Sequence, residues 1–184
     1  SKLSLSNSVR YEVDKITYLG QSFGYGNDTI PTVNANKTFN LNGAKSSIFY
    51  NISKSAKLSA NLSYGYKTGG VNQQPYVSAD NKIYSPEYLI SYEISFKNKT
   101  KNYFTSLSYF YNDRLDQQVS ISAQQNENDP NSFYYFTTNN KGRGYSRGLE
   151  LDMEVSILKN ISLKTGLAYL DTWASEFSYN ISEN

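Results

Sequence analysis

The sequence contains no cysteine and no histidine, and it has one methionine and one tryptophan among 184 residues. Without cysteine, the chain can form no disulfide, no thiolate metal site and no cysteine nucleophile. Without histidine, it lacks the commonest general base and the commonest zinc ligand. We therefore expect no catalytic residues, no bound metal and no cofactor, and we predict that the chain is not an enzyme.

Long apolar runs are also missing. No window of about 20 apolar residues occurs, so the sequence predicts no transmembrane helix. The net charge is only +2 and no two basic residues are adjacent, which argues against nucleic acid as a partner. Aromatic residues are nevertheless abundant, with 18 tyrosines and 9 phenylalanines, although only 38% of the chain is hydrophobic. This combination is typical of a membrane β-barrel, in which polar lumen-facing residues alternate with apolar lipid-facing ones.

Apolar residues recur at every second position through most of the chain. Leu58, Leu62 and Tyr64, for example, alternate with Ser59 and Asn61. A period of two predicts β-strands and excludes amphipathic helices. We expect seven antiparallel strands, at about residues 3–18, 44–52, 57–68, 87–97, 102–122, 133–157 and 161–175. Each apolar stripe covers about nine to eleven residues, the length that crosses a bilayer as a tilted strand. Tyrosines near the stripe ends predict an outer aromatic girdle, formed by Tyr64, Tyr66, Tyr88, Tyr109, Tyr111 and Tyr169.

The connections between these strands alternate in length. Short turns are expected around residues 53–56, 97–101 and 158–160, and long connections at about 20–42, 67–85 and 113–148. Outer-membrane barrels have short periplasmic turns and long extracellular loops. In the third connection, we expect the strands to continue beyond the membrane as a ribbon with a polar tip at residues 124–132. A soluble sheet with one buried face would show the same alternation within its strands but has no reason to sort its loops.

Seven strands cannot close a bacterial outer-membrane barrel, because the strand number of such barrels is even. An open edge in lipid would leave backbone groups without hydrogen bonds, which the bilayer does not tolerate. We therefore predict that residues 1–184 are part of a larger barrel domain, about a third of one with 22 strands. The remaining strands and the outer-membrane lipid are its expected partners.

Four segments carry a resemblance to a known family. Residues 85–97 read SPEYLISYEISFK, 64–72 read YGYKTGGVN, 110–118 read FYNDRLDQQ and 140–152 read NKGRGYSRGLELD. In this order they resemble the barrel of TonB-dependent outer-membrane receptors, over about residues 3–175. Ser95 stands where the family often has glycine, and Asp152 replaces a glutamate. A TonB box, a plug domain and a terminal strand ending in an aromatic residue are not found in the sequence.

The resemblance implies a receptor in the outer membrane of a Gram-negative bacterium that imports a scarce ligand. Such ligands are often ferric siderophores and sometimes cobalamin, haem or a glycan. Energy would come from TonB acting on a plug domain elsewhere in the polypeptide. This segment would supply barrel wall and extracellular loops.

Candidate ligand-binding residues lie in the second and third long connections, where cations suit an anionic chelate and aromatic rings suit catecholate or sugar faces. The alternative is that these polar side chains are solvated, or bond to one another or to the plug. The candidates are Lys67, Asn72, Gln73, Gln74, Tyr76, Arg114, Gln117, Gln118, Tyr134, Tyr135, Lys141, Arg143 and Arg147.

Two other functions remain open at this point. A passive outer-membrane porin would share the turns, the girdle and the alternation. A soluble β-rich carbohydrate-binding or adhesin module would use exposed tyrosines and Trp173 instead.

Overall fold

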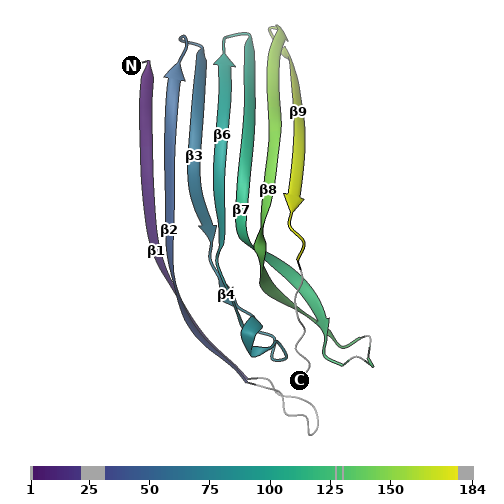
Figure 1. Cartoon of the computed structure of the whole chain (residues 1–184). Helices are drawn as coiled ribbons and strands as arrows, with labels where there is room; N and C mark the ends of the chain where they lie inside the picture. Colours follow the sequence, from purple (N-terminus) through teal and green to yellow (C-terminus); the bar gives the residue numbers. More distant parts are fainter. Residues whose placement is uncertain (1, 22–31, 127, 130, 178–184) are drawn as a thin grey trace.

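Seven long strands form one antiparallel sheet in the computed structural model, which describes residues 2–21, 32–126, 128–129 and 131–177. Their order is β1-β2-β3-β6-β7-β8-β9, so each long strand lies beside the next one along the chain (Figure 1). This confirms the predicted all-β, up-and-down antiparallel fold. The strands are β1 (Leu3–Gly20), β2 (Val33–Asn51), β3 (Ala56–Lys67), β6 (Glu87–Lys99), β7 (Tyr103–Gln124), β8 (Phe133–Leu158) and β9 (Ile161–Ala174).

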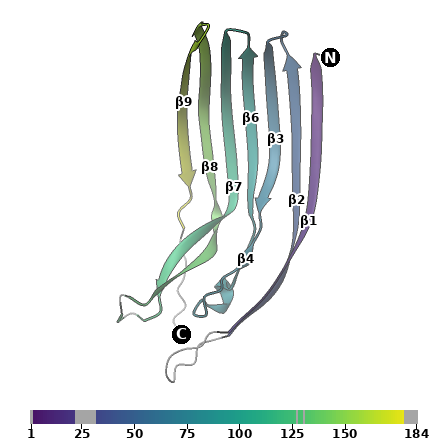
Figure 2. The ribbon, with the colours of Figure 1, turned by 180° about the vertical axis from the view of Figure 1, so that it is seen from behind.

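The tight turns all lie at one end of the sheet, and the long connections lie at the other (Figures 1 and 2). The β2–β3 turn shows why so few residues suffice there. The Ser53 hydroxyl oxygen accepts hydrogen bonds from the backbone N–H groups of Ser55 (3.2 Å) and Ala56 (3.0 Å). Serine side chains commonly satisfy the backbone of a turn in this way. We refer to the two ends as the short-turn end and the long-loop end.

One face of the sheet is apolar across all seven strands; we call it the outer face. A single row of paired residues runs along it from β1 to β9 and consists of Leu5, Ile48, Ala60, Ile94, Tyr109, Leu149 and Tyr169. Ile94 is 56% exposed and Tyr169 is 66% exposed. So wide an exposed apolar surface marks a face that contacts something other than water.

The opposite face, which we call the inner face, is polar. The neighbouring row consists of Ser4, Phe49, Ser59, Ser95, Ser108, Glu150 and Ala168. The hydroxyls of Ser59 and Ser95 lie 2.7 Å apart, so neighbouring strands hydrogen-bond through their side chains as well as their backbones. An apolar outer face and a polar inner face are the arrangement of a membrane barrel wall.

Aromatic rings are stacked along the outer face toward the long-loop end. Tyr92, Tyr111, Tyr145 and Trp173 form a chain across β6 to β9, with successive ring centroids 6.3, 5.9 and 6.0 Å apart. The row continues from β6 to β3, where Tyr88 of β6 stacks against Tyr64 of β3 with ring centroids 5.6 Å apart. We call these six rings the aromatic girdle.

β2 corrects one prediction, because it begins at Val33 and not near residue 44. Residues 33–42 pair with 11–20 of β1, so most of the predicted first loop is strand. The apolar residues change face at this level. Phe39 and Leu41 are buried on the inner face, whereas Ile48 and Tyr50 are exposed on the outer face. Looking for one continuous apolar stripe therefore missed the extension. The rest of that loop, residues 22–31, lies outside the described residues.

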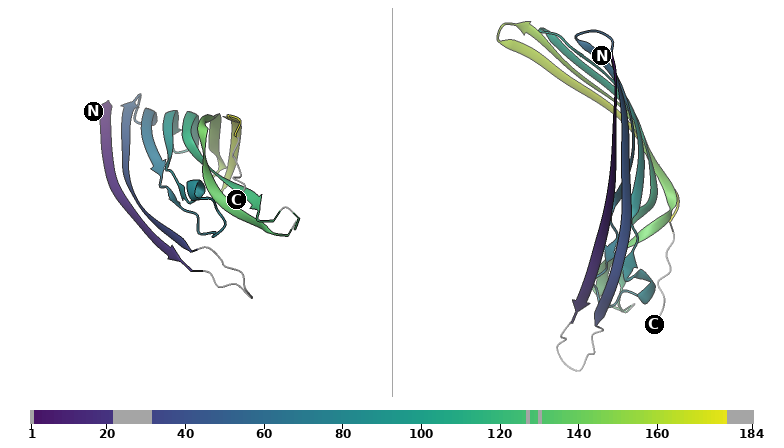
Figure 3. Two further views of the ribbon diagram at one scale, coloured as in Figure 1. Left: turned by 60° about the horizontal axis from the view of Figure 1, so that its bottom comes forward. Right: turned by 90° about the vertical axis from the view of Figure 1, so that its left-hand side faces the viewer.

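The third long connection is a hairpin that extends the sheet at the long-loop end (Figure 3). β7 continues to Gln124 and β8 returns from Phe133. A bulge between Leu115 and Gln117 bends the ladder, and Asp116 there has a φ of 54°. We call residues 117–140, beyond this bulge, the hairpin extension. Bulges of this kind increase the twist of a strand pair and redirect it.

The second long connection, residues 68–86, is called the second loop. It contains a two-stranded sheet of β4 (Gly70–Val71) and β5 (Ile83–Tyr84), and the short helix η1 (Ala79–Asn81). Among the described residues, no helix is long and apolar enough to cross a membrane.

Candidate functional site

The second loop is attached to the hairpin extension through the side chain of Asn72, which is buried. Its Nδ2 donates to the carbonyl oxygens of Thr137 and Asn81, both at 2.6 Å, and its Oδ1 accepts from the Thr137 backbone N–H at 2.8 Å. The side-chain amide thus makes the two hydrogen bonds to Thr137 that the backbone of a neighbouring strand would otherwise make. A β-strand edge covered in this way has its backbone groups satisfied.

A second attachment lies at the bulge. The Asn139 side-chain amide donates to Ser85 O (3.0 Å) and Asp116 O (2.8 Å), while its Oδ1 accepts from the Ser85 N–H (2.7 Å). Gln118 Nε2 donates to Thr68 O at 2.7 Å and to Ser85 O at 3.1 Å. Both ends of the second loop are therefore held by amide side chains of the hairpin.

Charge reinforces this attachment. The buried carboxylate of Glu87, the first residue of β6, accepts from the Gln118 N–H at 3.1 Å and pairs with the Arg114 guanidinium at 3.2 Å. Because Glu87 is largely removed from water, its two partners compensate the cost of burying a charge.

A small apolar core lies between the loop and the hairpin extension. Val77, Ala123 and Phe136 are buried together, and Tyr134 packs against them. The Tyr134 hydroxyl donates to Tyr76 O at 3.4 Å, and the two rings lie 6.5 Å apart. This core holds η1 and its neighbours against the sheet.

The loop also contacts β2. A Cβ added to Gly69 would lie 2.6 Å from Cζ of Phe39, an inner-face residue, so only glycine permits this approach. Because the second loop contacts inner-face residues of β2 as well as the hairpin extension, it folds over the inner side of the sheet. Lys82 closes the loop by donating to Pro75 O at 3.0 Å. Burial lowers the pKa of the Lys82 ammonium.

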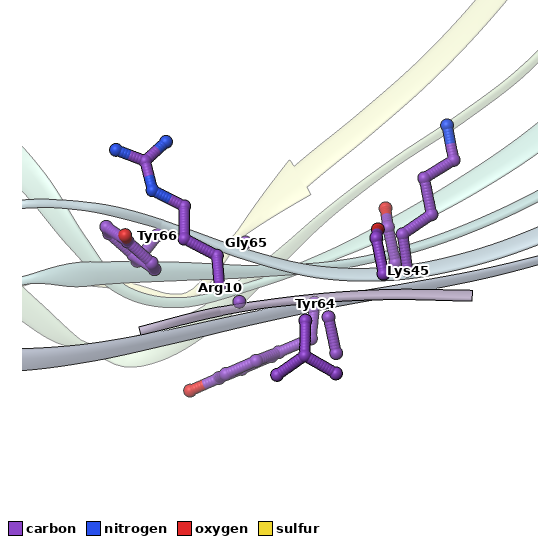
Figure 4. A pocket seen from close by; sticks show the side chains of 10 residues that line it. Arg10, Lys45, Tyr64, Gly65 and Tyr66 are labelled. Carbon is purple, nitrogen blue, oxygen red and sulfur yellow. The ribbon is translucent and has the colours of Figure 1, made fainter. Parts of the chain in front are cut away.

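A hollow of about 320 Å³ lies across β1, β2 and β3 near the long-loop end. Figure 4 shows that Arg10, Lys45 and Tyr66 project to one side of these strands, whereas Tyr64 projects to the other. Gly43 leaves space for the Tyr66 ring, whose Cε1 would lie 3.5 Å from a Cβ at that position.

Tyr66 therefore corrects its predicted place in the aromatic girdle. Its hydroxyl donates to Glu12 on the inner face at 2.9 Å. The ladder between β2 and β3 ends at Tyr64, so Tyr66 is not constrained to the face that strict alternation assigns. Tyr64 remains on the outer face, stacked on Tyr88.

The inner wall beside the hollow combines both charges with aromatic surface. The Arg10 guanidinium pairs with Glu12 and lies 5.9 Å from the Tyr66 ring centroid. Two residues further along the inner face of β1, toward the long-loop end, Asp14 accepts a hydrogen bond from the Thr68 hydroxyl at 2.7 Å. The Arg10 side chain is 72% exposed, so it is accessible from the inner side of the sheet.

The structure brings part of the predicted site together. Five predicted residues attach the second loop or line its contact with the hairpin: Asn72, Tyr76, Arg114, Gln118 and Tyr134. Gln73 and Gln74 are exposed between these attachments. Lys67 ends β3 opposite Glu87, and Gln117 lies beside Gly144.

Four predicted residues lie apart from this group. Tyr135 is exposed and packs edge-on against Phe133, at 5.6 Å between ring centroids. Lys141, Arg143 and Arg147 are exposed along β8, and Arg147 bonds to Asp171 at 2.8 Å. Arg147 shares the outer face with Leu149, away from the hollow.

Sequence reasoning missed several residues that form this region. Arg10, Glu12 and Asp14 alternate on the polar face of the first strand, a signal that was present in the pattern. Asn139 had no such signal, because its role depends on a bulge that brings Ser85 to it. The acidic row of Glu150, Asp152 and Glu154 lies on the inner face, and Lys164 pairs with Glu154 at 3.3 Å. In the described part of the chain, no three metal-binding side chains are grouped to hold an ion.

Comparison with known proteins places this sheet in a family. Residues 1–184 match the family described as TonB dependent receptor-like, beta-barrel. A search of curated protein sequences finds no match.

Solved structures share the fold. The ferric yersiniabactin uptake receptor FyuA from Yersinia pestis is 19% identical, with a TM-score of 0.75 over 95% of this chain and 25% of that one. The copper transporter OprC is 14% identical, with a TM-score of 0.71 over 94% and 27%. The ferric-catecholate import receptor Fiu from K12 E. coli is 16% identical, with a TM-score of 0.66 over 95% and 26%.

This chain thus spans about a quarter of the length of these structures. TonB-dependent receptor β-barrels lie in the outer membrane of Gram-negative bacteria. The apolar outer face, the aromatic girdle and the alternating connections agree with that location. The chain belongs to the TonB-dependent receptor β-barrel family.

Proposed function

We propose that this chain forms barrel wall and extracellular loops of a receptor that binds and imports a scarce small ligand, such as a ferric siderophore. The observation that carries the proposal is the inward fold of the second loop. Asn72 and the Val77 core hold the loop on the inner side of the sheet, where Gln73 and Gln74 remain exposed. A loop fixed there presents its polar groups to the lumen mouth.

The inner wall supplies complementary chemistry for an anionic chelate. Arg10 and Lys45 add positive charge around the hollow, and Tyr66 adds an aromatic face. Ligand sites commonly combine a concave surface with a few polar groups that fix orientation. The neighbouring structures include receptors named for ferric yersiniabactin and for ferric catecholates, which favours an iron chelate over other nutrients.

The energy source and the remaining partners are part of the same proposal. A plug domain and further barrel strands of the same polypeptide would complete the receptor, and TonB would act through the plug. Because the edges of this seven-stranded sheet cannot face lipid unpaired, they need neighbouring strands.

Membership of the family favours a receptor over the alternative functions. A passive porin and a soluble carbohydrate-binding module would both need another explanation for the match over the whole chain. The family consists of transport receptors and not of enzymes.

The test is ligand binding and uptake by the full-length receptor. A panel of iron-loaded siderophores is offered to cells grown under iron limitation, and iron uptake is compared with that of a deletion strain. For a ligand that is taken up, Arg10→Gln should weaken binding about 10- to 100-fold, the value of a hydrogen bond to a charged group.

Lys15→Gln is the matched control. Lys15 is an exposed cation on the same strand, but it lies on the outer face, whereas Arg10 lies on the inner face. Uptake of no metal chelate by the complemented strain would refute the proposed function. Equal losses in Arg10→Gln and Lys15→Gln would refute the role of the hollow, while leaving uptake itself established.

A further inference from the structure

Three cations on β8 follow its outer side toward the long-loop end; we call Lys141, Arg143 and Arg147 the outer column. Arg147 pairs in register with Tyr111 of the aromatic girdle, and Arg143 pairs with Leu115. All three cations are exposed. The intervening residues face the other way, as Ser146 shows by hydrogen bonding to the inner-face Asn112.

The girdle fixes the level of this column relative to the membrane. Tyr145 lies between Arg143 and Arg147 and stacks on Tyr111 and Trp173, with centroids 5.9 and 6.0 Å away. Aromatic girdles mark the boundary between hydrocarbon and headgroups. Toward the short-turn end the same side of β8 is apolar, beginning with Leu149. The outer column therefore starts at the hydrocarbon boundary and continues through the headgroup layer.

Two carboxylates share this surface, and both lie near Arg147 and Tyr145. The Lys141 end of the outer column therefore keeps its positive charge. Asp171 is bonded to Arg147 at 2.8 Å, and the Arg147 guanidinium also lies 5.3 Å from the Tyr145 ring centroid. Asp113 pairs in register with Tyr145. Among the residues that the structure describes, neither Lys141 nor Arg143 has a side-chain hydrogen bond or ion pair. Within this described part of the chain, their charges therefore have no side-chain partner.

Phosphate is the chemistry that these groups recognise. A guanidinium presents a planar set of donors that matches phosphate oxygens, and an ammonium adds a point charge. Alternate residues of a strand lie about 6.6 Å apart, so both cations can reach one headgroup. Basic residues beside a membrane-spanning segment attract anionic lipid.

We propose that Lys141 and Arg143, above Arg147 and Tyr145, bind a phosphate group of the glycolipid in the outer leaflet. Tyr145 and Trp173 then contact the boundary between its sugars and its acyl chains. This site depends on the membrane location of the barrel and not on the imported ligand. A phosphorylated lipid is favoured over a second copy of the chain, because the column continues directly from the lipid-facing girdle.

The experiment measures glycolipid bound to the full-length receptor. The receptor is purified in mild detergent, and native mass spectrometry follows the binding of added bisphosphorylated lipid A. Lys141→Gln combined with Arg143→Gln should raise the apparent dissociation constant about 10- to 30-fold. Lys57→Gln combined with Lys97→Gln removes the same charge from paired inner-face positions, and it should leave the dissociation constant within about twofold.

Folding is checked by the shift in gel mobility on boiling, which both double variants should retain. Equal binding of dephosphorylated lipid A by the unaltered receptor would overturn the proposal. So would an equal loss in the two double variants, or full displacement of the lipid by inorganic phosphate at millimolar concentration. A dimer that disappears only in the Lys141/Arg143 variant would show that a second copy occupies the surface, which also overturns it.

Discussion

Replacing Asn72 by alanine should detach the second loop from the hairpin extension without unfolding the barrel. The change removes the three hydrogen bonds that the Asn72 side chain makes to Thr137 and Asn81. It leaves the N–H and C=O groups of Thr137 and the carbonyl of Asn81 without these partners. The long ladders of the sheet do not involve this side chain, so the effect stays local.

The magnitude follows from those bonds. Each neutral hydrogen bond contributes about 1 kcal/mol net, and a buried group left without a partner costs about 1–3 kcal/mol. Water can reach the groups that lose their partners, so we expect each to cost an amount near the lower end of its range. The total loss of loop-docking free energy is then about 2–4 kcal/mol. A factor of ten corresponds to about 1.4 kcal/mol, so opening should become roughly 30- to 800-fold more frequent.

Hydrogen exchange measures this opening directly. Full-length receptor in detergent micelles is labelled with deuterium, and peptides covering residues 68–86 and 133–143 are followed by mass spectrometry. In Asn72→Ala the Thr137 amide should exchange faster by the factor above, whereas amides in the ladder between β2 and β3 should keep their rates. Gln73→Ala, at an exposed neighbouring position, is the control and should change nothing.

Asn72→Asp separates hydrogen bonding from shape, because it keeps the size of the side chain. Its carboxylate still accepts from the Thr137 N–H but faces two carbonyl oxygens that need a donor. It should therefore open the loop at least as much as alanine does. Exchange of Thr137 within threefold of the unaltered receptor in Asn72→Ala would refute the reasoning.

Three further predictions concern the same end of the sheet. Val77→Ala should cost about 1–3 kcal/mol of loop docking by leaving a cavity beside Phe136, and the exchange rates of the loop amides should rise accordingly; unchanged rates would show that the core is not formed. Burial lowers the pKa of Lys82, so the docked loop binds fewer protons than the open one, and docking should strengthen as pH rises toward the usual lysine pKa. Proteolytic cleavage of the loop should therefore slow as pH rises toward the usual lysine pKa, and Lys82→Met should abolish that dependence; an opposite slope would contradict the burial of Lys82. Gly43→Leu should fill the space beside Tyr66 and weaken ligand binding through the hollow without altering heat-modifiability, and unchanged ligand affinity would count against the hollow as a binding surface.

The alternation of apolar and polar residues was sufficient to predict the sheet. Side chains on a strand point to alternate faces, so a row such as Ile48, Ala60 and Ile94 is visible in the sequence as a period of two. The unequal connections indicated which end carries the loops, and the motifs around Glu87 and Glu150 pointed to the family. These features depend on local order along the chain.

The start of β2 could not be found in the same way. Beyond the membrane-spanning part, the apolar residues Phe39 and Leu41 belong to the inner face and pack beneath the second loop. A stripe that changes face looks irregular to a search for one continuous period. Tyr66 was misplaced for a related reason, since alternation assumes a partner strand on both sides and β2 no longer pairs with it.

The amino-acid sequence by itself determined the strand period, the length of the apolar stripes and the sorting of the connections, because each of these follows from neighbouring residues. Only the tertiary structure decided what the polar residues of the long connections do. Asn72 and Gln118 were candidate ligand contacts in the sequence, and Asn139 carried no signal there. All three nevertheless bond to backbone groups up to 65 residues away and attach the second loop to the hairpin extension. Amide side chains bond equally well to a ligand, to water or to a strand edge, and the choice depends on which partner the fold brings within about 3 Å.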